Sequence, residues 1–163
     1  MFTVAIITLS DKGAKGERED ISGRVIRDMM TEAGYTVTEQ LLLNDDREGL
    51  SLELKRIADN HLADLILTTG GTGFSPRDNA PEATMDVIQR PVPGIAEAMR
   101  LCSLQITKRA MLSRAVSGIR ESTLIINLPG SPKAVKENLA YLLDTLDHGL
   151  AILTGKDGEC ARK

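Results

Sequence analysis

The stretch Ala63-Asp-Leu-Ile-Leu-Thr-Thr-Gly-Gly-Thr-Gly73 joins an apolar run to a glycine-rich segment without a break. Residues 63–69 combine aliphatic and β-branched side chains, the composition of a strand buried on both faces in a parallel sheet. Three of the next four residues are glycines, which adopt positive φ angles and let a backbone approach a ligand closely. The stretch therefore predicts a central strand followed by a loop that fits a phosphate or another extended anion.

The alternative for this loop, residues 70–78, is a tight turn that needs glycine only for its backbone shape. Polar side chains close to the glycines favour a ligand site instead. The loop is not the dinucleotide motif G-x-G-x-x-G, because Pro76 stands where the last glycine belongs. The candidate binding residues of this glycine-rich loop are Gly70, Gly71, Thr72, Gly73, Ser75 and Arg77.

Apolar runs predict further strands on both sides of this stretch. They cover residues 3–9, 37–43 and 122–128, and composition also predicts a strand over 110–119. The short spacer 118–121 between the last two predicts a hairpin.

Apolar residues at helical spacing separate most of these strands. Helices are expected to begin after Asp20, after Asp45 and Asp46, which both stand where an N-cap belongs, and after the break at 129–132, with two more over 82–89 and 94–107. The alternation predicts a three-layer α/β/α domain with a mostly parallel sheet and an antiparallel edge hairpin.

Length and composition restrict the class of protein. The 163 residues, 42% hydrophobic and 26% charged, are typical of one globular domain, expected to span 1–163. A net charge of −3 without long charged runs and only 2% aromatic residues argue against a nucleic-acid partner. The run at 3–9 is too short for a signal core or a membrane span, so we expect a cytoplasmic chain with no membrane partner.

The cysteines and histidines do not form a zinc motif. Cys102 and Cys160 lie far apart, and neither shares ligand spacing with a histidine. We expect Cys102 to be a small buried residue rather than a nucleophile, because no histidine is near it in sequence. His61 and His148 are expected at surface positions of helices, and the basic pairs 108–109 and 162–163 are expected to be solvated.

Ligands of open α/β sheets bind beyond the carboxyl ends of the strands, where loops meet helix N-termini. Four loops have this place: 10–19, 44–47, 70–78 and 129–132. If their strands are parallel, the loops lie along one edge and form one site. Besides the glycine-rich loop, they contribute the candidate binding residues Ser10, Pro129, Gly130 and Ser131.

Asp45 and Asp78 are the candidate catalytic carboxylates, expected at the ends of two neighbouring strands and facing a shared crevice. Two acids beside bound phosphate suggest Mg²⁺, which takes oxygen ligands and bridges protein carboxylates to substrate phosphate. A helix cap is the alternative role. Capping is favoured for Asp46, and position alone weighs the two roles equally for Asp45. Arg77, beside the loop, is ambiguous between anion binding and a surface position, with anion binding favoured.

Residues 68–84, which read TTGGTGFSPRDNAPEAT, resemble the signature of the molybdenum cofactor biosynthesis family. The match continues over 110–114 (AMLSR), 118–120 (GIR) and 122–132 (STLIINLPGSP). Within this family the chain is most similar to the molybdopterin adenylyltransferases, which include bacterial Mog-type proteins and the G domains of gephyrin-like proteins. The resemblance covers nearly the whole chain.

The resemblance implies an enzyme that transfers AMP from Mg-ATP to the terminal phosphate of molybdopterin and releases pyrophosphate. It also implies a homotrimer and a molybdenum-insertion enzyme as a possible partner. The family's motif acids map onto Asp45 and Asp78, and a family serine implicated in pterin handling maps onto Ser103. The segment 16–23 resembles the family's Gly, Asp, Ser-Gly pattern, and the matching residues are Asp20, Ser22 and Gly23.

The resemblance leaves some alternatives open. Asn44 replaces the usual proline before the family's acid and Asp46 follows it, so the site acid is Asp45 or Asp46. A non-catalytic molybdopterin carrier or scaffold is one other function, and retention of both acids argues against it. A MoaB-like or competence-associated nucleotide-binding relative is another, and the long match over 110–132 favours the adenylyltransferase branch. The sequence decides neither the metal that is finally inserted, molybdenum or tungsten, nor the ligand part that the glycine-rich loop holds.

Overall fold

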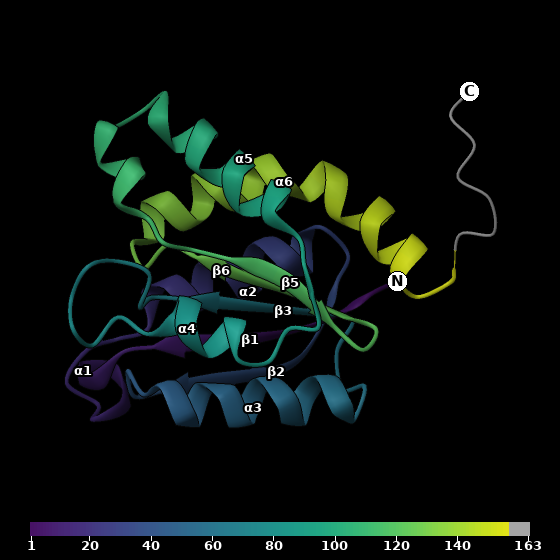
Figure 1. The fold of residues 1–163 in the computed structure, drawn as a ribbon, viewed down its shortest axis with the longest axis horizontal. Helices are drawn as coiled ribbons and strands as arrows, with labels where there is room; N and C mark the ends of the chain where they lie inside the picture. Colours follow the sequence, from purple (N-terminus) through teal and green to yellow (C-terminus); the bar gives the residue numbers. More distant parts are fainter. Residues whose placement is uncertain (157–163) are drawn as a thin grey trace.

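Six strands form one mixed sheet in the computed structural model, which describes residues 1–156 (Figure 1). In chain order they are β1 (Thr3–Leu9), β2 (Thr36–Leu43), β3 (Leu65–Thr69), β4 (Arg90–Pro91), β5 (Ser117–Arg120) and β6 (Thr123–Leu128). Their order across the sheet is β2-β1-β3-β6-β5-β4. β1, β2, β3 and β6 are parallel, and β5 turns back antiparallel to β6. The predicted parallel sheet with an antiparallel hairpin towards one edge is confirmed.

Helices cover both faces of this sheet (Figure 1). One face carries α2 (Ile21–Glu32), α5 (Pro93–Leu104) and α6 (Pro132–Leu153), and the other carries α3 (Arg47–Asp59) and α4 (Ala80–Met85). A short helix, α1 (Asp11–Ala14), follows β1, and a 3₁₀ helix, η1 (Lys108–Leu112), follows α5. The three-layer architecture is the predicted one. Among residues 1–156, no helix is both long and apolar enough to cross a membrane.

The central strands are apolar on both faces because each face has its own core. Val4 and Ile6 of β1 pack towards α2, α5 and α6, whereas Ala5 and Ile7 pack towards α3 and α4. Successive side chains of a strand point to opposite faces, so a strand between two helical layers must be apolar at every position. Burial of each such large side chain stabilises the fold by about 1.5–3 kcal/mol.

Side-chain caps fix where three helices begin beside the candidate loops. Asp20 accepts a hydrogen bond from the Gly23 amide at 2.8 Å, and Asp46 accepts one from the Gly49 amide at 2.8 Å. Ser131 does the same for the start of α6. The predicted helix starts after Asp20 and Asp46 are confirmed, and so is the capping role favoured for Asp46.

The prediction of a strand over 110–119 is wrong for most of that segment. Its first residues belong to η1, and only the part from Ser117 onwards pairs in the sheet. The backbone groups between them bond elsewhere: the Arg114 amide donates to the Thr72 carbonyl at 2.9 Å, and Arg100 donates to the Ala115 carbonyl at 2.8 Å. Contacts far apart in sequence therefore override the local strand propensity.

Other boundaries differ from the prediction by a few residues. The hairpin turn lies at 121–122 instead of 118–121, because Gly118, Ile119 and Arg120 are paired within β5. β4 and α1 were not predicted from the sequence pattern, and α4 begins at Ala80 rather than Glu82.

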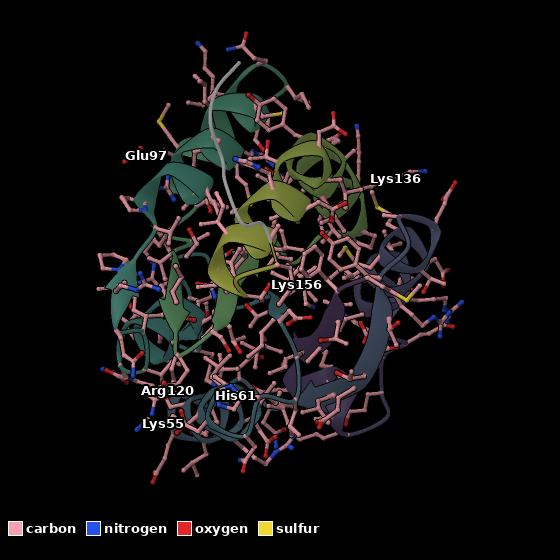
Figure 2. All side chains as sticks on the ribbon, turned by 90° about the vertical axis from the view of Figure 1, so that its right-hand side faces the viewer. Lys55, His61, Glu97, Arg120, Lys136 and Lys156 are labelled. Atoms are coloured by element: carbon pink, nitrogen blue, oxygen red, sulfur yellow. The ribbon has the colours of Figure 1, made fainter. Side chains whose placement is uncertain are left out.

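His61 lies in the turn after α3, not on a helix, with a φ of 52° and its Nδ1 3.2 Å from the Ser122 hydroxyl. Figure 2 shows His61 near Arg120 at the edge of the sheet where the parallel strands begin. His148 is an exposed residue of α6, as expected. The edge of the sheet where His61 and Arg120 lie is opposite to the edge that carries the candidate loops.

Candidate active site

The four predicted loops lie along one edge of the sheet. β1, β2, β3 and β6 are parallel, so their carboxyl ends all face the same way, towards the left of Figure 1. Two cavities are found among these loops, and together they contain most of the predicted binding residues.

The first cavity, named here the Ser103 cavity, has a volume of about 290 Å³. The predicted residues Thr72, Gly73, Ser103 and Pro129 line it, beside side chains of α5, η1 and α6. The Asn138 side chain donates to the Ser103 hydroxyl at 3.0 Å, which orients both polar groups in a largely apolar pocket. A mostly apolar cavity with a few oriented polar groups is typical of a site for a small organic molecule.

The second cavity, named here the Ser22 cavity, has a volume of about 490 Å³. The predicted residues Ser10, Asp20, Ser22, Gly70 and Gly130 line it. The Ser22 hydroxyl donates to the Gly130 carbonyl at 2.7 Å, and Asp20 accepts from the hydroxyl of Thr8 at 2.8 Å. The first bond holds the N-terminal end of α2 against the loop that follows β6, and the second holds it against β1.

The two cavities share one wall, built from the glycine-rich loop and the loop after β6. Gly70 and Gly130 face the Ser22 cavity, whereas Gly73 and Pro129 face the Ser103 cavity. The backbones lie very close, because a Cβ on Gly130 would be 3.4 Å from the Gly70 Cα. The Thr69 hydroxyl also donates to the Pro129 carbonyl at 2.6 Å. Two ligands in these cavities would be separated only by this thin wall of backbone.

Asp45 lies beside the cavities in a reciprocal pair with Asp11. The Asp11 amide donates to Asp45 Oδ2 at 3.0 Å, and the Asp45 amide donates to Asp11 Oδ1 at 3.0 Å. Arg77 donates to both Asp11 oxygens, at 2.9 and 2.7 Å. The predicted anion ligand Arg77 is therefore paired with a carboxylate of the protein. Its side chain is 60% exposed, and an exposed pair of this kind is worth only about 0–1 kcal/mol, so a substrate phosphate can compete for Arg77.

The pKa values of the Asp45 and Asp11 carboxyls are shifted in opposite directions. Burial raises the pKa of the Asp45 carboxyl, the Asp11 amide opposes that effect, and the charges of Asp11 and Asp78 raise the pKa further. The hydrogen bond from Arg77 instead lowers the pKa of Asp11. A cation near Asp45 would stabilise its ionised form, because an opposite charge favours a carboxylate.

Asp78 is positioned by a turn within the glycine-rich loop. Its Oδ2 accepts from the Ser75 amide at 2.9 Å, and its own amide donates to the Ser75 carbonyl at 2.9 Å. The expectation that the strands before Asp45 and Asp78 are neighbours is wrong, because β1 lies between β2 and β3. The charge of Asp78 still helps to raise the pKa of the Asp45 carboxyl, so the loops bring the two acids near each other across the intervening strand.

The acids fit a magnesium ion that arrives with a nucleotide better than a resident metal. Within residues 1–156 there is no cluster of three or more His, Cys, Asp or Glu side chains able to hold a metal ion. Mg²⁺ is commonly bound by one or two carboxylates, with waters and substrate phosphates as its other ligands. Asp45 and Asp78 each use one oxygen for a backbone amide, which leaves the other oxygen of each carboxylate as a hard donor.

Other predicted site residues have structural contacts and line neither cavity. Ser131 caps α6, and Ser75 holds Asp78 in its turn. Gly71 has a φ of 68° and accepts the Ala80 amide with its carbonyl. Gly23 lies so close to Asp20 that a Cβ would be 2.2 Å from the carboxylate. These four shape the loops that carry the cavities.

Sequence reasoning missed several polar residues of the cavities. Arg100, Arg109 and Asn138 line the Ser103 cavity, and Arg18 lines the Ser22 cavity. Arg109 is exposed, as expected, but it also borders the Ser103 cavity. Asn138 had a detectable signal: it is a polar residue, 2% exposed, on the apolar face of α6.

Of the two cysteines, only Cys102 lies among the described residues. The expectation that Cys102 is buried is wrong, because this free thiol of α5 is of intermediate burial; it lines neither cavity. Cys160 and the basic pair 162–163 lie outside the described residues.

Comparison with known proteins finds relatives in molybdopterin biosynthesis. Residues 5–148 match the family model described as a probable molybdopterin binding domain. The molybdopterin adenylyltransferase of Helicobacter pylori J99 is 37% identical over 154 residues, which cover 93% of this chain and 88% of that protein. Gephyrin of Dictyostelium discoideum is 40% identical over 95% of this chain, which corresponds to 23% of that longer protein. The crystal structure of the molybdopterin biosynthesis enzyme MoaB from Thermus thermophilus is 46% identical with a TM-score of 0.90, and covers 98% of this chain and 100% of that one.

Proposed function

Because the chain belongs to the molybdopterin-binding family of molybdenum cofactor biosynthesis proteins, we propose that it is a molybdopterin adenylyltransferase. In this reaction AMP moves from Mg-ATP to the terminal phosphate of molybdopterin, and pyrophosphate leaves. We further propose that residues 1–163 are one domain and that the protein works in the cytoplasm.

The observation that carries this proposal is the pair of cavities on either side of one glycine-rich wall. A transfer between two phosphorylated molecules needs both of them bound at once, with their phosphates close together. Because Gly70, Gly73 and Gly130 have no side chains, backbone forms much of the wall between the cavities. Two substrates placed in these cavities meet at the edge of the sheet, beside Asp45 and Asp78.

The chemical demand of the reaction fits this arrangement. A phosphate oxygen of molybdopterin attacks the α-phosphorus of ATP, a new phosphoanhydride bond forms, and the bond to pyrophosphate breaks. The attacking phosphate is already ionised near neutral pH, so no general base is needed. Alignment and relief of charge repulsion supply most of the acceleration.

Asp45 and Asp78 would hold the magnesium ion that accompanies ATP. When bound, Mg²⁺ neutralises phosphate charge and orients the phosphate oxygens. Arg77 would leave Asp11 to bind a substrate phosphate, since its exposed guanidinium is suited to bidentate phosphate recognition.

We assign the pterin to the Ser103 cavity and the nucleotide to the Ser22 cavity. Ser103 is the residue that the family resemblance links to pterin handling, and its hydroxyl is held by Asn138 inside an apolar pocket. The Ser22 cavity is the larger of the two and less apolar, and four hydroxyl side chains line it, which suit a ribose and phosphates. The family resemblance further supports a homotrimer and a molybdenum-insertion enzyme as the acceptor of the product.

The test is single-turnover formation of adenylylated molybdopterin from molybdopterin, ATP and Mg²⁺. We expect product with the unaltered protein and a fall of at least about 100-fold in Asp45→Ala and Asp78→Ala, the scale of losing one group that stabilises the transition state. Molybdopterin binding, measured by fluorescence, should change little in both variants, because neither acid lines the Ser103 cavity. Removal of Mg²⁺ with a chelator should stop the unaltered enzyme.

Two results would contradict the proposal in different ways. Tight pterin binding without product under any divalent cation would instead support a carrier or scaffold. Full activity and unchanged Mg²⁺ dependence in Asp78→Asn would remove that residue from the metal site.

A further inference from the structure

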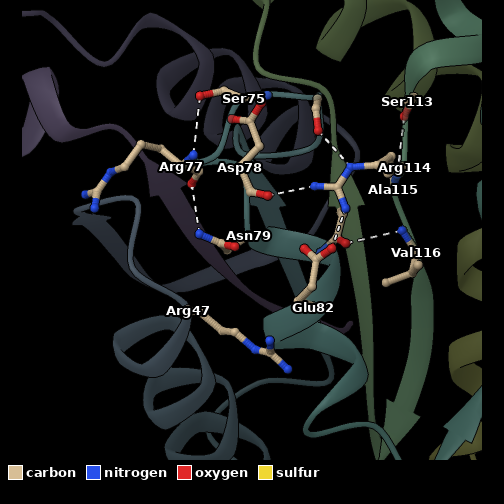
Figure 3. A network of polar contacts seen from close by, with 12 residues as sticks. Arg47, Ser75, Arg77, Asp78, Asn79, Glu82, Ser113, Arg114, Ala115 and Val116 are labelled. Carbon is tan, nitrogen blue, oxygen red and sulfur yellow. Dashed lines mark hydrogen bonds and ion pairs between the residues drawn. The ribbon is translucent and has the colours of Figure 1, made fainter.

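Arg114 lines neither cavity, yet its side chain binds the glycine-rich loop at two carbonyls and pairs with Glu82 (Figure 3). Its Nε donates to the Gly73 carbonyl at 2.7 Å, and its Nη2 donates to the Asp78 carbonyl at 2.6 Å. The third nitrogen, Nη1, is ion-paired with Glu82. One planar guanidinium therefore holds the two ends of residues 73–78.

The backbone of Arg114 continues this contact. Its amide donates to the Thr72 carbonyl at 2.9 Å, so main chain and side chain bind three carbonyls of the same loop. The residues on either side of it, Ser113 and Ala115, have carbonyls that accept from Arg100. Arg100 and Ser113 line the Ser103 cavity. Arg114 therefore lies between the wall of that cavity and the loop that carries Asp78.

Glu82 fixes the direction of the guanidinium from the first turn of α4. Its Oε1 binds Arg114, and its Oε2 is buried without a hydrogen-bond partner among the described residues. The hydrogen bond from Arg114 holds the pKa of Glu82 below its ordinary value. Glu82 is therefore ionised and paired with Arg114. The pair is about two-thirds buried, since 33% of the Arg114 side chain and 35% of the Glu82 side chain are exposed.

We propose that Arg114 is a positioning residue for adenylyl transfer: by binding the Gly73 and Asp78 carbonyls together, it sets the place of the Asp78 carboxylate relative to the Ser103 cavity. This inference rests on the proposed function for its kinetic part. The physical basis is geometric, because only the forked guanidinium reaches two carbonyls and a carboxylate at once, and a lysine ammonium on a flexible stem does not reproduce this fork. Small misplacement of a catalytic group costs about 100-fold in rate.

Arg120 offers a matched control at the opposite edge of the sheet. It donates to both Asp59 oxygens, at 2.7 and 2.9 Å, and to the Val87 carbonyl at 2.9 Å. Its side chain is 19% exposed, so it is at least as buried as that of Arg114. It shares the type of contact with Arg114 but touches no part of the candidate site, which separates a loss of positioning from a loss of stability.

The experiment compares Arg114→Lys with Arg120→Lys, using kcat, KM, the free energy of unfolding, and hydrogen exchange of the amides over 70–79. In Arg114→Lys we expect kcat to fall about 10- to 100-fold while the KM values for ATP and molybdopterin change little. Exchange over 70–79 should become faster. In Arg120→Lys we expect a lower free energy of unfolding, with kcat and loop exchange unchanged.

Glu82→Gln keeps the inference testable if Arg114→Lys does not fold. The amide retains an acceptor for Arg114 without the charge, so kcat should fall less than in Arg114→Lys and loop exchange should rise slightly. The inference is overturned if Arg114→Lys and Glu82→Gln keep the kcat of the unaltered enzyme, or if kcat falls in Arg114→Lys and Arg120→Lys alike, in proportion to stability. If the unaltered protein forms no product, the proposed function fails. Hydrogen exchange of the amides over 70–79 then still tests whether Arg114 orders the loop. Unchanged exchange in Arg114→Lys would overturn that part of the inference.

Discussion

Gly70, at the end of β3, shows at the scale of one residue why this loop needs glycine. Its φ is 93°, and a Cβ at this position would lie 2.5 Å from the carbonyl oxygen of Leu9 in the neighbouring strand. The left-handed backbone alone disfavours every L side chain, and the contact with Leu9 adds a collision with backbone that cannot move aside. The turn and the cavity wall therefore impose the same requirement on one residue.

We predict that Gly70→Ala lowers the free energy of unfolding by at least about 2 kcal/mol, from the left-handed strain and the collision together. The control is Gly149→Ala. Gly149 is an exposed position of α6, and a Cβ there meets nothing within 4 Å. Because glycine destabilises a helix interior, this change should stabilise the protein by about 0.5–1 kcal/mol. Urea unfolding measures both, and equal effects of the two substitutions would contradict the argument.

The start of α3 shows how one element divides two adjacent acids between structure and site. Asp46 caps the helix through the Gly49 amide, whereas Asp45 binds the Asp11 amide, and the charges of Asp11 and Asp78 raise its pKa. Asp46 is exposed and Asp45 is of intermediate burial. Of the two acids that the sequence left as candidates, Asp45 and Asp46, this arrangement supports Asp45 as the site acid.

For the same helix we predict that Asp46→Ala costs about 1 kcal/mol of folding stability, the usual loss of an N-cap, and leaves the rate of adenylyl transfer close to that of the unaltered enzyme. Asp46→Asn should be nearly neutral, because asparagine also caps well. Urea unfolding and single-turnover assays on the same samples give both quantities. A large loss of activity in Asp46→Asn with normal stability would make Asp46 the site acid instead.

Arginine–carboxylate pairs join distant segments across the whole molecule. Hydrogen bonds from arginine are the main cause that lowers the pKa of these carboxyls, which are Asp11, Glu39, Asp59, Glu82 and Asp86. A carboxyl with a lowered folded-state pKa stabilises the fold fully above its ordinary pKa of about 4, and this contribution is lost as the pH falls through the lowered value. The effect of Asp45 on folding stability has the opposite pH dependence. Burial raises the folded-state pKa of this carboxyl, so its contribution to stability is present at low pH and is lost as the pH rises.

We therefore predict that the free energy of unfolding falls as the pH is lowered from neutral to about 3. Asp59→Asn should make this fall shallower, since one carboxyl with a lowered pKa is removed. Asp45→Asn should make it steeper, since the opposing group is removed. Chemical unfolding at several pH values measures the slopes. Identical slopes in the three proteins would contradict the assignment of these pKa shifts.

The amino-acid sequence by itself determined the central strands, the helix starts and the edge of the sheet that carries the site. Local physics is sufficient for these features. Runs such as 3–9 are apolar at nearly every position, Asp20 and Asp46 cap the helices that follow them, and parallel strands place their carboxyl ends together. Family resemblance added Ser103, whose place beside the cavity has no local signal.

Only the tertiary structure decided how these parts meet. The segment 110–116 departs from its strand propensity because its backbone bonds to Thr72 and Arg100, and β1 separates the strands that precede Asp45 and Asp78. Residues far apart in the chain also form the thin wall between the two cavities and the hydrogen bonds from Arg114 to the glycine-rich loop. Pattern and propensity describe a residue's neighbours in sequence, whereas these contacts arise from side chains and carbonyls that become neighbours only when the sheet and its helices pack together.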